Sequence, residues 1–287
     1  MHLPVGEPQR IPGHLFLAYS AKGLREVLRR TASPIPLNKL RGSRFAVSLA
    51  LPSTLAAPPV QNVRPAVHLT GPYGNSFVLC CVEAANGGDV DHIDLPACPP
   101  LAAVPREASP CVNSDAALSR LLRSCGVQPV GAGTDALCLG LLQMQYEVPA
   151  GTAAAVAAFY RRHFGCEGVE VEAQGPGGRP CAIVPMGLDG AQRVVFAERP
   201  EGERGPDYDG HHFALYLASH EAFEAAFNSL HAAERVWINP RFADKVDTLD
   251  AAQQELQFRI KDVEGFELEH EVRSPRHSSC PLMLATN

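Results

Sequence analysis

The chain has 287 residues, of which 46% are hydrophobic and 20% are charged, which is enough to bury a large core in one or two domains. Its formal net charge of −6 at pH 7 argues against nucleic acid or an anionic membrane as a partner. No apolar run approaches a membrane span, and the first residues lack the pattern of a signal peptide. Nine cysteines without a CxxC pair fit reduced thiols, so we expect a cytoplasmic protein.

The N-terminal part begins with a strand pattern, GHLFLAYS at 13–20, that precedes a helical stretch. AVHLTGPYGNSFVLC at 66–80 has the pattern of two strands joined by a tight glycine turn. Residues 85–136 are less regular and carry one helix pattern, SDAALSRLLRSCG at 114–126. We expect residues 11–84 to form a degenerate structural unit, and residues 85–136 to be a connector or a decayed fourth unit.

The middle of the chain predicts one helix among four strands. The helix pattern covers 152–164, with Thr152 as its N-cap and Gly165 after its last residue. Strand patterns occur at 137–148, 168–173, 180–186 and 192–198. The segment 137–200 is therefore predicted to be a β-α-β-β-β unit.

The same order returns at 208–273, after a polar linker at 199–210. Ser219 can cap a helix at 220–230, on which Phe223 and Phe227 share a face. Strand patterns occur at 211–218, 235–240, 255–260 and 265–272. Direct comparison exposes a third copy in the N-terminal part, since 13–20 is similar to 210–219 and 66–80 is similar to 258–271. Residues 137–273 are expected to form one C-terminal domain.

Alternation along four of these strands separates a polar face from an apolar face. The polar set is Gln143, Gln145, Glu147, His212, Tyr216, Glu255, Gln257, Arg259, Glu267, Glu269 and Glu271. The apolar set, which should pack against the helices, is Leu142, Met144, Tyr146, Val148, Phe213, Leu215, Leu217, Leu256, Phe258, Ile260, Phe266 and Leu268. The same parity points His211 toward the helices. Helices on one side of a curved sheet would gather the polar set into one cup.

These features resemble the vicinal oxygen chelate superfamily, which includes glyoxalase I, extradiol dioxygenases and bleomycin-resistance proteins. The resemblance rests on the paired units and on AAFYRRHFG at 157–165, HHFALYLAS at 211–219 and DVEGFELEHE at 262–271. It implies an α+β fold in which repeated β-α-β-β-β units form curved mixed sheets with the helices outside. It also implies a divalent metal in the cup, with Fe, Mn, Zn and Ni as the candidates.

The resemblance implies a site whose residues come from separate strands. The implied metal ligands are Gln143, His212 and Glu269, and Glu269 is also the catalytic candidate because a carboxylate can move a proton. A fourth ligand position falls near Phe196 or Glu198, and the expected pocket residues are Gln145, Tyr216 and Arg259. Three ligands would leave coordination positions open for a bidentate oxygen substrate.

The N-terminal copy differs at this site, because His14 matches His212 whereas Val78 stands in the place of Glu269. We therefore expect no metal there, and a role in pairing units, shaping the pocket or forming the contact of a homodimer.

Three functions stay open for the whole chain. The leading one is a metal-dependent glyoxalase- or dioxygenase-like enzyme acting on a small oxygen-rich substrate. The second is a non-enzymatic protein that binds a small molecule in the cup. The third is a scaffold or interaction protein that keeps the fold after losing its metal site.

Overall fold

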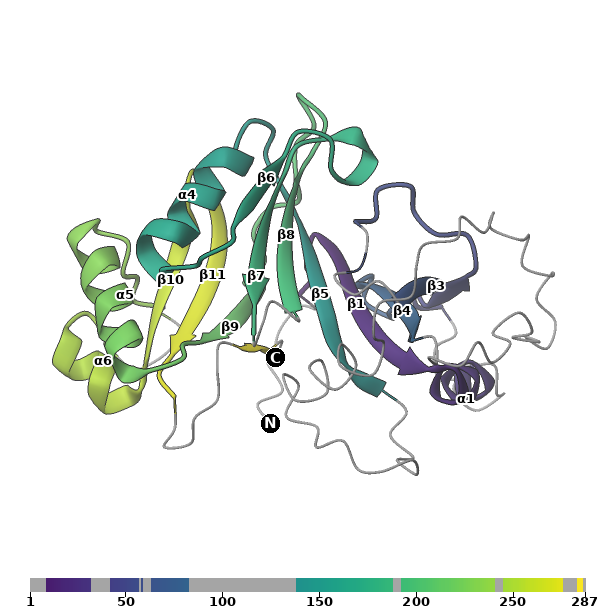
Figure 1. Cartoon of the computed structure of the whole chain (residues 1–287), viewed down its shortest axis with the longest axis horizontal. Coiled ribbons are helices and arrows are strands. Elements are labelled where there is room, and N and C mark those ends of the chain that lie inside the picture. The colour runs from purple at the N-terminus through teal and green to yellow at the C-terminus, as the bar shows by residue number, and fades with distance from the viewer. Residues whose placement is uncertain are drawn as a thin grey trace.

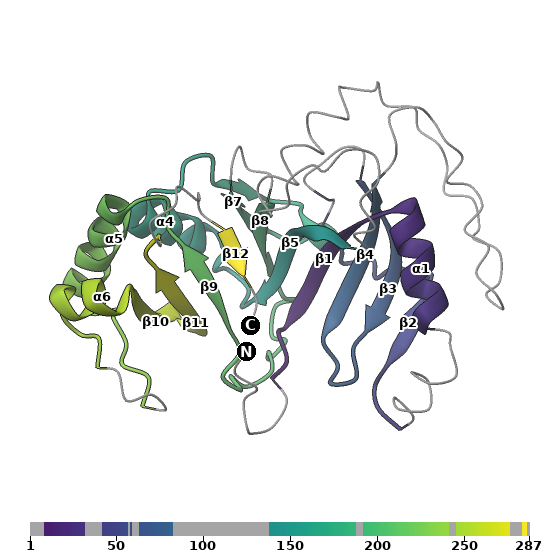
Figure 2. The same ribbon diagram turned by 90° about the horizontal axis from the view of Figure 1, so that it is seen from below.

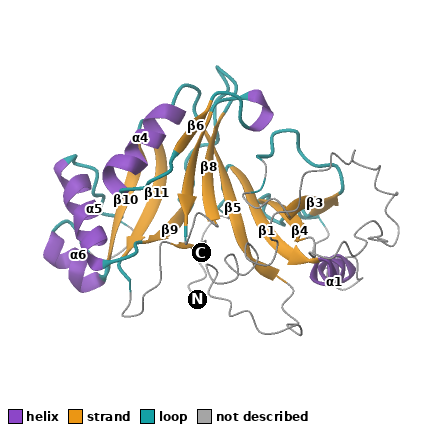
Figure 3. Cartoon of the chain, viewed as in Figure 1, coloured by secondary structure: helices purple, strands orange, loops and turns teal. Residues whose placement is uncertain are grey.

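The structure is a computed structural model that describes the chain in eight stretches. These are residues 9–31, 42–56, 58, 63–82, 138–187, 192–240, 245–275 and 283–285. The expected connector at 85–136 lies outside the described residues. Curved mixed sheets with helices packed on them confirm the predicted α+β class (Figure 3).

The N-terminal part and the middle of the chain each form a β-α-β-β-β unit. The first unit consists of β1 (Gly13–Ser20), α1 (Ala21–Thr31), β2 (Ala46–Ser48), β3 (Val63–Thr70) and β4 (Ser76–Val82). The middle unit consists of β5 (Cys138–Val148), α4 (Ala153–Phe164), β6 (Glu170–Glu172), β7 (Cys181–Met186) and β8 (Gln192–Glu198). A short 3-10 turn, η1 (Pro176–Gly178), lies between β6 and β7.

These two units share a single eight-stranded sheet, in the order β2-β3-β4-β1-β5-β8-β7-β6 (Figure 1). β1 and β5 pair antiparallel at its centre, and in each unit the last strand lies parallel beside the first. The close approach of β1 to β5 requires glycine at position 13, because a Cβ there would lie 2.0 Å from the carbonyl oxygen of Gln145. The N-terminal unit is thus paired edge to edge with the middle unit.

The C-terminal unit forms a smaller four-stranded sheet, in the order β10-β11-β9-β12. Its elements are β9 (His212–Tyr216), α5 (His220–Ala232), α6 (Leu249–Glu255), β10 (Gln257–Val263), β11 (Phe266–Arg273) and β12 (Met283–Ala285). The strand predicted at 235–240 is reduced to one bridge between Val236 and Ile260, and α6 takes the start of the strand predicted at 255–260. β12 pairs antiparallel with β9, as β1 does with β5.

The helices lie at the two ends of the molecule. Figure 2 shows α1 against the strands of the first unit, and α4, α5 and α6 together at the opposite end. No helix in the described stretches has the length and apolar character needed to cross a membrane.

The apolar faces of both sheets meet in one core with α4 and α5. Met144 and Tyr146 of β5 belong to the same buried cluster as Phe213 of β9 and Leu268 of β11. Strand parity is therefore confirmed for these strands. His211 also follows its predicted parity, since its Nε2 lies 2.5 Å from the Tyr146 hydroxyl in the interior.

Leu142 departs from the predicted parity because β5 carries a bulge there. The register against β1 jumps from Phe16 opposite Gln143 to Leu17 opposite Leu141, which leaves Leu142 without an opposing residue on β1. Leu142 consequently packs with Phe16 and Val78, on the other side of the eight-stranded sheet.

The two predicted helix caps have different outcomes. The Ser219 hydroxyl accepts a hydrogen bond from the Ala222 backbone N–H at 3.1 Å, as expected for the N-cap of α5. Thr152 occupies the N-cap position of α4, but its hydroxyl donates to the Pro149 carbonyl instead. The cap is supplied by Glu198, whose carboxylate accepts from the N–H groups of Gly151 and Ala153, each at 2.8 Å.

Removing the Glu198 carboxylate should destabilise the fold, because two backbone donors at the start of α4 lose their acceptor and the helix dipole loses a favourable charge. We expect Glu198→Ala to lower the free energy of unfolding by about 1–2 kcal/mol in urea titrations. Thr152→Ala, which removes a hydroxyl that caps no N–H group, is the matched control and should change stability less. Equal losses in the two variants would contradict the assignment of the cap.

His270 is a buried neutral imidazole in the core between the sheets. Its Nδ1 donates to the Leu268 carbonyl at 2.9 Å, so its Nε2 must accept from the Tyr160 hydroxyl, 2.5 Å away. Burial lowers the pKa of His270 from 6.5 to about 4.

Acid should therefore weaken the fold before carboxylates titrate. Below pH 6.5 the unfolded chain binds a proton at His270 that the folded chain binds only near pH 4, so protonation favours unfolding across this window. The expected loss is about 3 kcal/mol between pH 6.5 and pH 4. Urea unfolding across this range should show a shallower pH dependence for His270→Gln, while the exposed-site control His231→Gln should behave like the native protein. An unchanged slope in His270→Gln would refute this assignment.

Candidate functional site

The polar faces of the two sheets turn away from each other, because their apolar faces share one core. Gln143 lies on the polar face of β5, whereas His212 and Glu269 lie on the polar faces of β9 and β11. The structure brings His212 and Glu269 together and, within one chain, leaves Gln143 apart from them. The metal-binding role of these residues stays a prediction.

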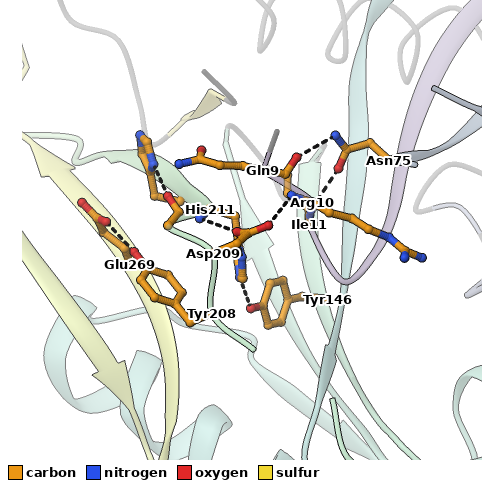
Figure 4. A network of polar contacts seen from close by, with 11 residues as sticks. Gln9, Arg10, Ile11, Asn75, Tyr146, Tyr208, Asp209, His211 and Glu269 are labelled. Carbon is orange, nitrogen blue, oxygen red and sulfur yellow. Dashed lines mark hydrogen bonds and ion pairs between the residues drawn. The ribbon is translucent and has the colours of Figure 1, made fainter. Parts of the chain in front are cut away.

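Glu269 is the centre of a polar cluster on the C-terminal sheet. It lies opposite His212 in the parallel pair β9–β11 and is only 1% exposed. Its Oε2 accepts from the Tyr208 hydroxyl at 2.6 Å (Figure 4). Its Oε1 accepts from the Asn239 amide at 3.1 Å. A buried carboxylate would be costly without such partners.

His212 is held in one tautomer by the backbone. Its Nδ1 lies 3.1 Å from the carbonyl oxygen of Gly210, which can only accept, so Nδ1 carries the proton. In the neutral ring, the other nitrogen, Nε2, then has the lone pair through which imidazole binds a metal.

Cations partly neutralise the acidic face of β11. Arg259 lies 3.9 Å from Glu269 and 4.0 Å from Glu271, and it is almost fully buried. Arg273 forms an ion pair with Glu271, and Lys261 binds the more exposed Glu267 at 2.6 Å.

The expected pocket residues Tyr216 and Arg259 both belong to this polar face. Arg259 lies against Glu269, whereas Tyr216 lies at the end of β9, opposite Arg273 of β11. Gln145, the third expected pocket residue, belongs to the other sheet.

A chain of hydrogen bonds ties the C-terminal cluster to the N-terminal unit (Figure 4). Asp209 accepts from the ring Nδ1 of His211 at 2.8 Å and from the Arg10 backbone N–H at 2.6 Å. Asn75, in the turn before β4, accepts from the Ile11 N–H at 2.9 Å. Residues 208–211 are thereby positioned by all three units.

On the eight-stranded sheet, Gln143 lies beside a cation. Arg193 of β8 is its register partner, and the Arg193 Nε donates to Gln143 Oε1 at 2.6 Å. Gln143 is fully buried, and its Nε2 has no hydrogen-bond partner among the described residues. Burial lowers the pKa of Arg193, and the nearby Glu172 carboxylate opposes that shift.

Gln145 binds a separate stretch of backbone that crosses the same polar face. Its Oε1 accepts from the Ala56 N–H at 2.8 Å, and its Nε2 donates to the Thr54 carbonyl at 2.7 Å. We call residues 51–56 the strap. Leu55 and Ala56 of the strap pack into the apolar clusters on this face of the sheet.

A cavity of about 320 Å³ lies between the strap and the middle unit. The strap side contributes Leu55 and Ala56, and the sheet contributes Arg193, Cys181 and Val195. Cys181 is buried, which raises the pKa of its thiol to about 11, and its S–H points to the Glu172 carboxylate. The cavity therefore combines apolar walls with one guanidinium and one carboxylate, that of Glu172.

The N-terminal unit presents a third polar arrangement. The register of β1 and β4 places Ser76 opposite His14. The sequence alignment through the glycine turn puts Val78 in this position, so that alignment is corrected by two residues. The Ser76 hydroxyl lies 2.6 Å from His14 Nδ1 and 2.8 Å from His68 Nε2. Burial, and secondarily His68, lowers the pKa of His14 to about 4, so this unit holds a neutral imidazole pair.

The predicted ligand set does not fit a metal as a whole. The oxygen of Gln143 already accepts from Arg193, whose positive charge would repel a divalent cation at that point. In the described stretches no group of three or more His, Cys, Asp or Glu side chains is arranged to hold a metal ion. The fourth position fails for Glu198, which caps α4, and Phe196 is a buried core residue. Only His212 and Glu269 fit, as a pair.

Sequence reasoning missed Arg193, Tyr208, Asn239 and the strap. Arg193 precedes Val194 on β8 and so faces the opposite side of the sheet, and strand parity could therefore have placed it on the polar face. Tyr208 and Asn239 lie outside regular strands, where no periodicity indicates direction. Contacts of the strap with Gln145 span about ninety residues and leave no local signal.

Comparison with known proteins assigns part of the chain. Residues 143–269 match the family model described as Glyoxalase/Bleomycin resistance protein/Dioxygenase superfamily. The match begins at Gln143 and ends at Glu269, so it spans β5 to β11. No curated protein matches the sequence.

Several solved structures are similar to about half of the chain. Lactoylglutathione lyase from Agrobacterium tumefaciens is 18% identical, with 45% of this chain and 90% of that chain covered and a TM-score of 0.27. Oxidase ChaP-H2 is 21% identical, with coverages of 47% and 94% and a TM-score of 0.29. A glyoxylase/bleomycin resistance protein/dioxygenase domain from Frankia sp. EAN1pec is 12% identical, with coverages of 52% and 98% and a TM-score of 0.29.

Proposed function

We propose that this chain, whose residues 143–269 match the model of the Glyoxalase/Bleomycin resistance protein/Dioxygenase superfamily, binds a small molecule on its eight-stranded sheet. The ligand that we propose is a small, partly apolar compound with one carboxylate. One observation carries the proposal, namely that the guanidinium of Arg193 lines the cavity of about 320 Å³.

The chemistry of the cavity favours this class of ligand. A guanidinium offers a planar set of N–H donors that matches a carboxylate and stays charged even when partly buried. Gln143 takes the Nε donor and thereby fixes the orientation of the Arg193 group. The apolar walls from Leu55, Ala56 and Val195 suit the remainder of the ligand.

The same arrangement favours binding without metal chemistry in this cavity. Arg193 stands beside Gln143 at the register position that Glu269 holds beside His212. The positive charge of Arg193 thus lies against Gln143, which the sequence predicted to be a metal ligand. This supports the second of the functions considered from the sequence, a non-enzymatic binding protein.

Benzoate and benzamide, which share shape and differ in charge, test the proposal. In isothermal titration calorimetry the native protein should bind benzoate, and benzamide should bind at least about tenfold more weakly because it lacks the charge. Arg193→Gln should weaken benzoate binding by about 10–100-fold. Arg204→Gln removes a highly exposed guanidinium outside the cavity and serves as the control. Equal affinities for the two compounds, or unchanged binding by Arg193→Gln, would refute the proposal.

A second candidate function is supported by the tautomer of His212. Its Nε2 lone pair and the Glu269 carboxylate lie on adjacent strands, as two ligands of one divalent metal would. Such a metal, when bound, supplies a Lewis acid that polarises a carbonyl or enediolate, or binds a catecholate and dioxygen. Tyr208 and Asn239 would then orient Glu269, which could also hold a proton during the reaction.

Thermal unfolding with and without Mn²⁺, Fe²⁺, Zn²⁺ or Ni²⁺ tests this second candidate. A metal that binds only the folded state should raise the unfolding midpoint as its concentration rises. Glu269→Gln should abolish that rise, whereas Glu267→Gln, at the more exposed end of the same strand face, should keep most of it. The metal site is ruled out if no metal shifts the midpoint and Glu269→Gln is neutral or stabilising throughout.

A further inference from the structure

The strap closes one side of the ligand cavity without belonging to any helix or strand. Its Leu55 and Ala56 line the cavity, while Gln174, Gly175 and Gly177 line it from the middle unit. The two sides approach each other, because a Cβ added at Gly177 would lie 3.4 Å from the methyl carbon of Thr54. A ligand that enters from this side has to pass between the strap and η1.

Gln145 attaches the strap to the floor of the cavity. Its amide is fully buried, and both of its polar atoms bind strap backbone, at Ala56 and Thr54. Hydrogen bonds from the Gln145 side chain thus take the place of the backbone hydrogen bonds that would hold a β-strand here. Opening the strap breaks these two hydrogen bonds and the packing of Leu55 and Ala56, while the sheet stays intact.

We propose that the strap is the movable wall of the cavity and that Gln145 is the positioning residue that latches it closed. The inference rests on the proposed function for the nature of the ligand, but the latch itself can be measured without one. In the closed state both amide atoms of Gln145 are satisfied. In the open state water satisfies the freed groups of Ala56 and Thr54, so the opening is local.

Cys181 provides a reporter for this opening. It lines the cavity, is fully buried, and has a pKa raised to about 11, so its thiol reacts slowly while the strap is closed. Cys81 on β4 is also buried, but it packs with Leu24 and Leu28 of α1 and does not line the cavity, so its reaction requires α1 or the sheet to open. The exposed Cys138 calibrates the reagent.

The experiment is alkylation of the full chain with N-ethylmaleimide, followed by peptide mass spectrometry to give a rate for each cysteine. Gln145→Met keeps the length of the side chain and removes both hydrogen bonds to the strap. We expect it to raise the rate at Cys181 by about tenfold or more, with Cys81 unchanged. Gln192→Met is the matched control, since Gln192 is a buried glutamine whose Nε2 donates to backbone at Leu141, away from the strap.

Three outcomes would overturn the latch. One is an unchanged Cys181 rate in Gln145→Met, and another is an equal increase in Gln192→Met. The third is a parallel rise at Cys81, which would mean that the variant opens the sheet as a whole. Amide hydrogen exchange at Ala56 gives a second readout and should speed up in Gln145→Met alone.

Benzoate separates the latch from the proposed function. If benzoate binds through Arg193 and the alkylation rate of Cys181 is unchanged in Gln145→Met, the binding proposal stands and the latch fails. If Gln145→Met exposes Cys181 but benzoate does not bind, the latch stands and the ligand class is wrong. If both hold, benzoate should slow the alkylation of Cys181 in the native protein.

Discussion

The apolar contact between β5 and the pair β9–β11 decides where every polar face of this molecule points. Met144, Tyr146, Phe213 and Leu268 share one buried cluster, and burying this area is the dominant favourable term of the fold. Since side chains alternate along a strand, each residue between these positions has to face the other way. The C-terminal half of the chain therefore has two polar faces, back to back, and cannot gather them into one site by itself.

The three structural units place different chemistry at equivalent points of the same register. The first strand and the last strand of each unit present His14 beside Ser76, Gln143 beside Arg193, and His212 beside Glu269. Each pair makes a distinct local environment: neutral, cationic and anionic. Repetition of the backbone thus preserves positions, while the charge at those positions determines which ligand each face can hold.

Edge pairing gives the middle unit its particular environment. Because β1 pairs with β5, the two units share one sheet, and the strap between β2 and β3 crosses the polar face at Gln145. Of the two buried glutamines on this face, Gln143 binds the guanidinium of Arg193 and Gln145 binds the backbone of the strap. The C-terminal sheet has only the short β12 at the corresponding edge, and its carboxylates are partly balanced by arginine and lysine from its own strands.

Alternation, repeat order and helix caps made of adjacent residues could be read from the sequence alone. They correctly placed Phe213 and Leu215 in the core, His211 on the same side of its strand, and Ser219 at the start of α5, because each depends only on local backbone geometry. Tertiary structure alone decided that β1 pairs with β5, that Gln143 meets Arg193 apart from Glu269, and that Glu198 caps α4. The first strands of the three units have similar patterns, so local alternation cannot determine which of these strands pair with each other. Only long-range packing, and with it the bulge at Leu142 and the strap over Gln145, selects one arrangement.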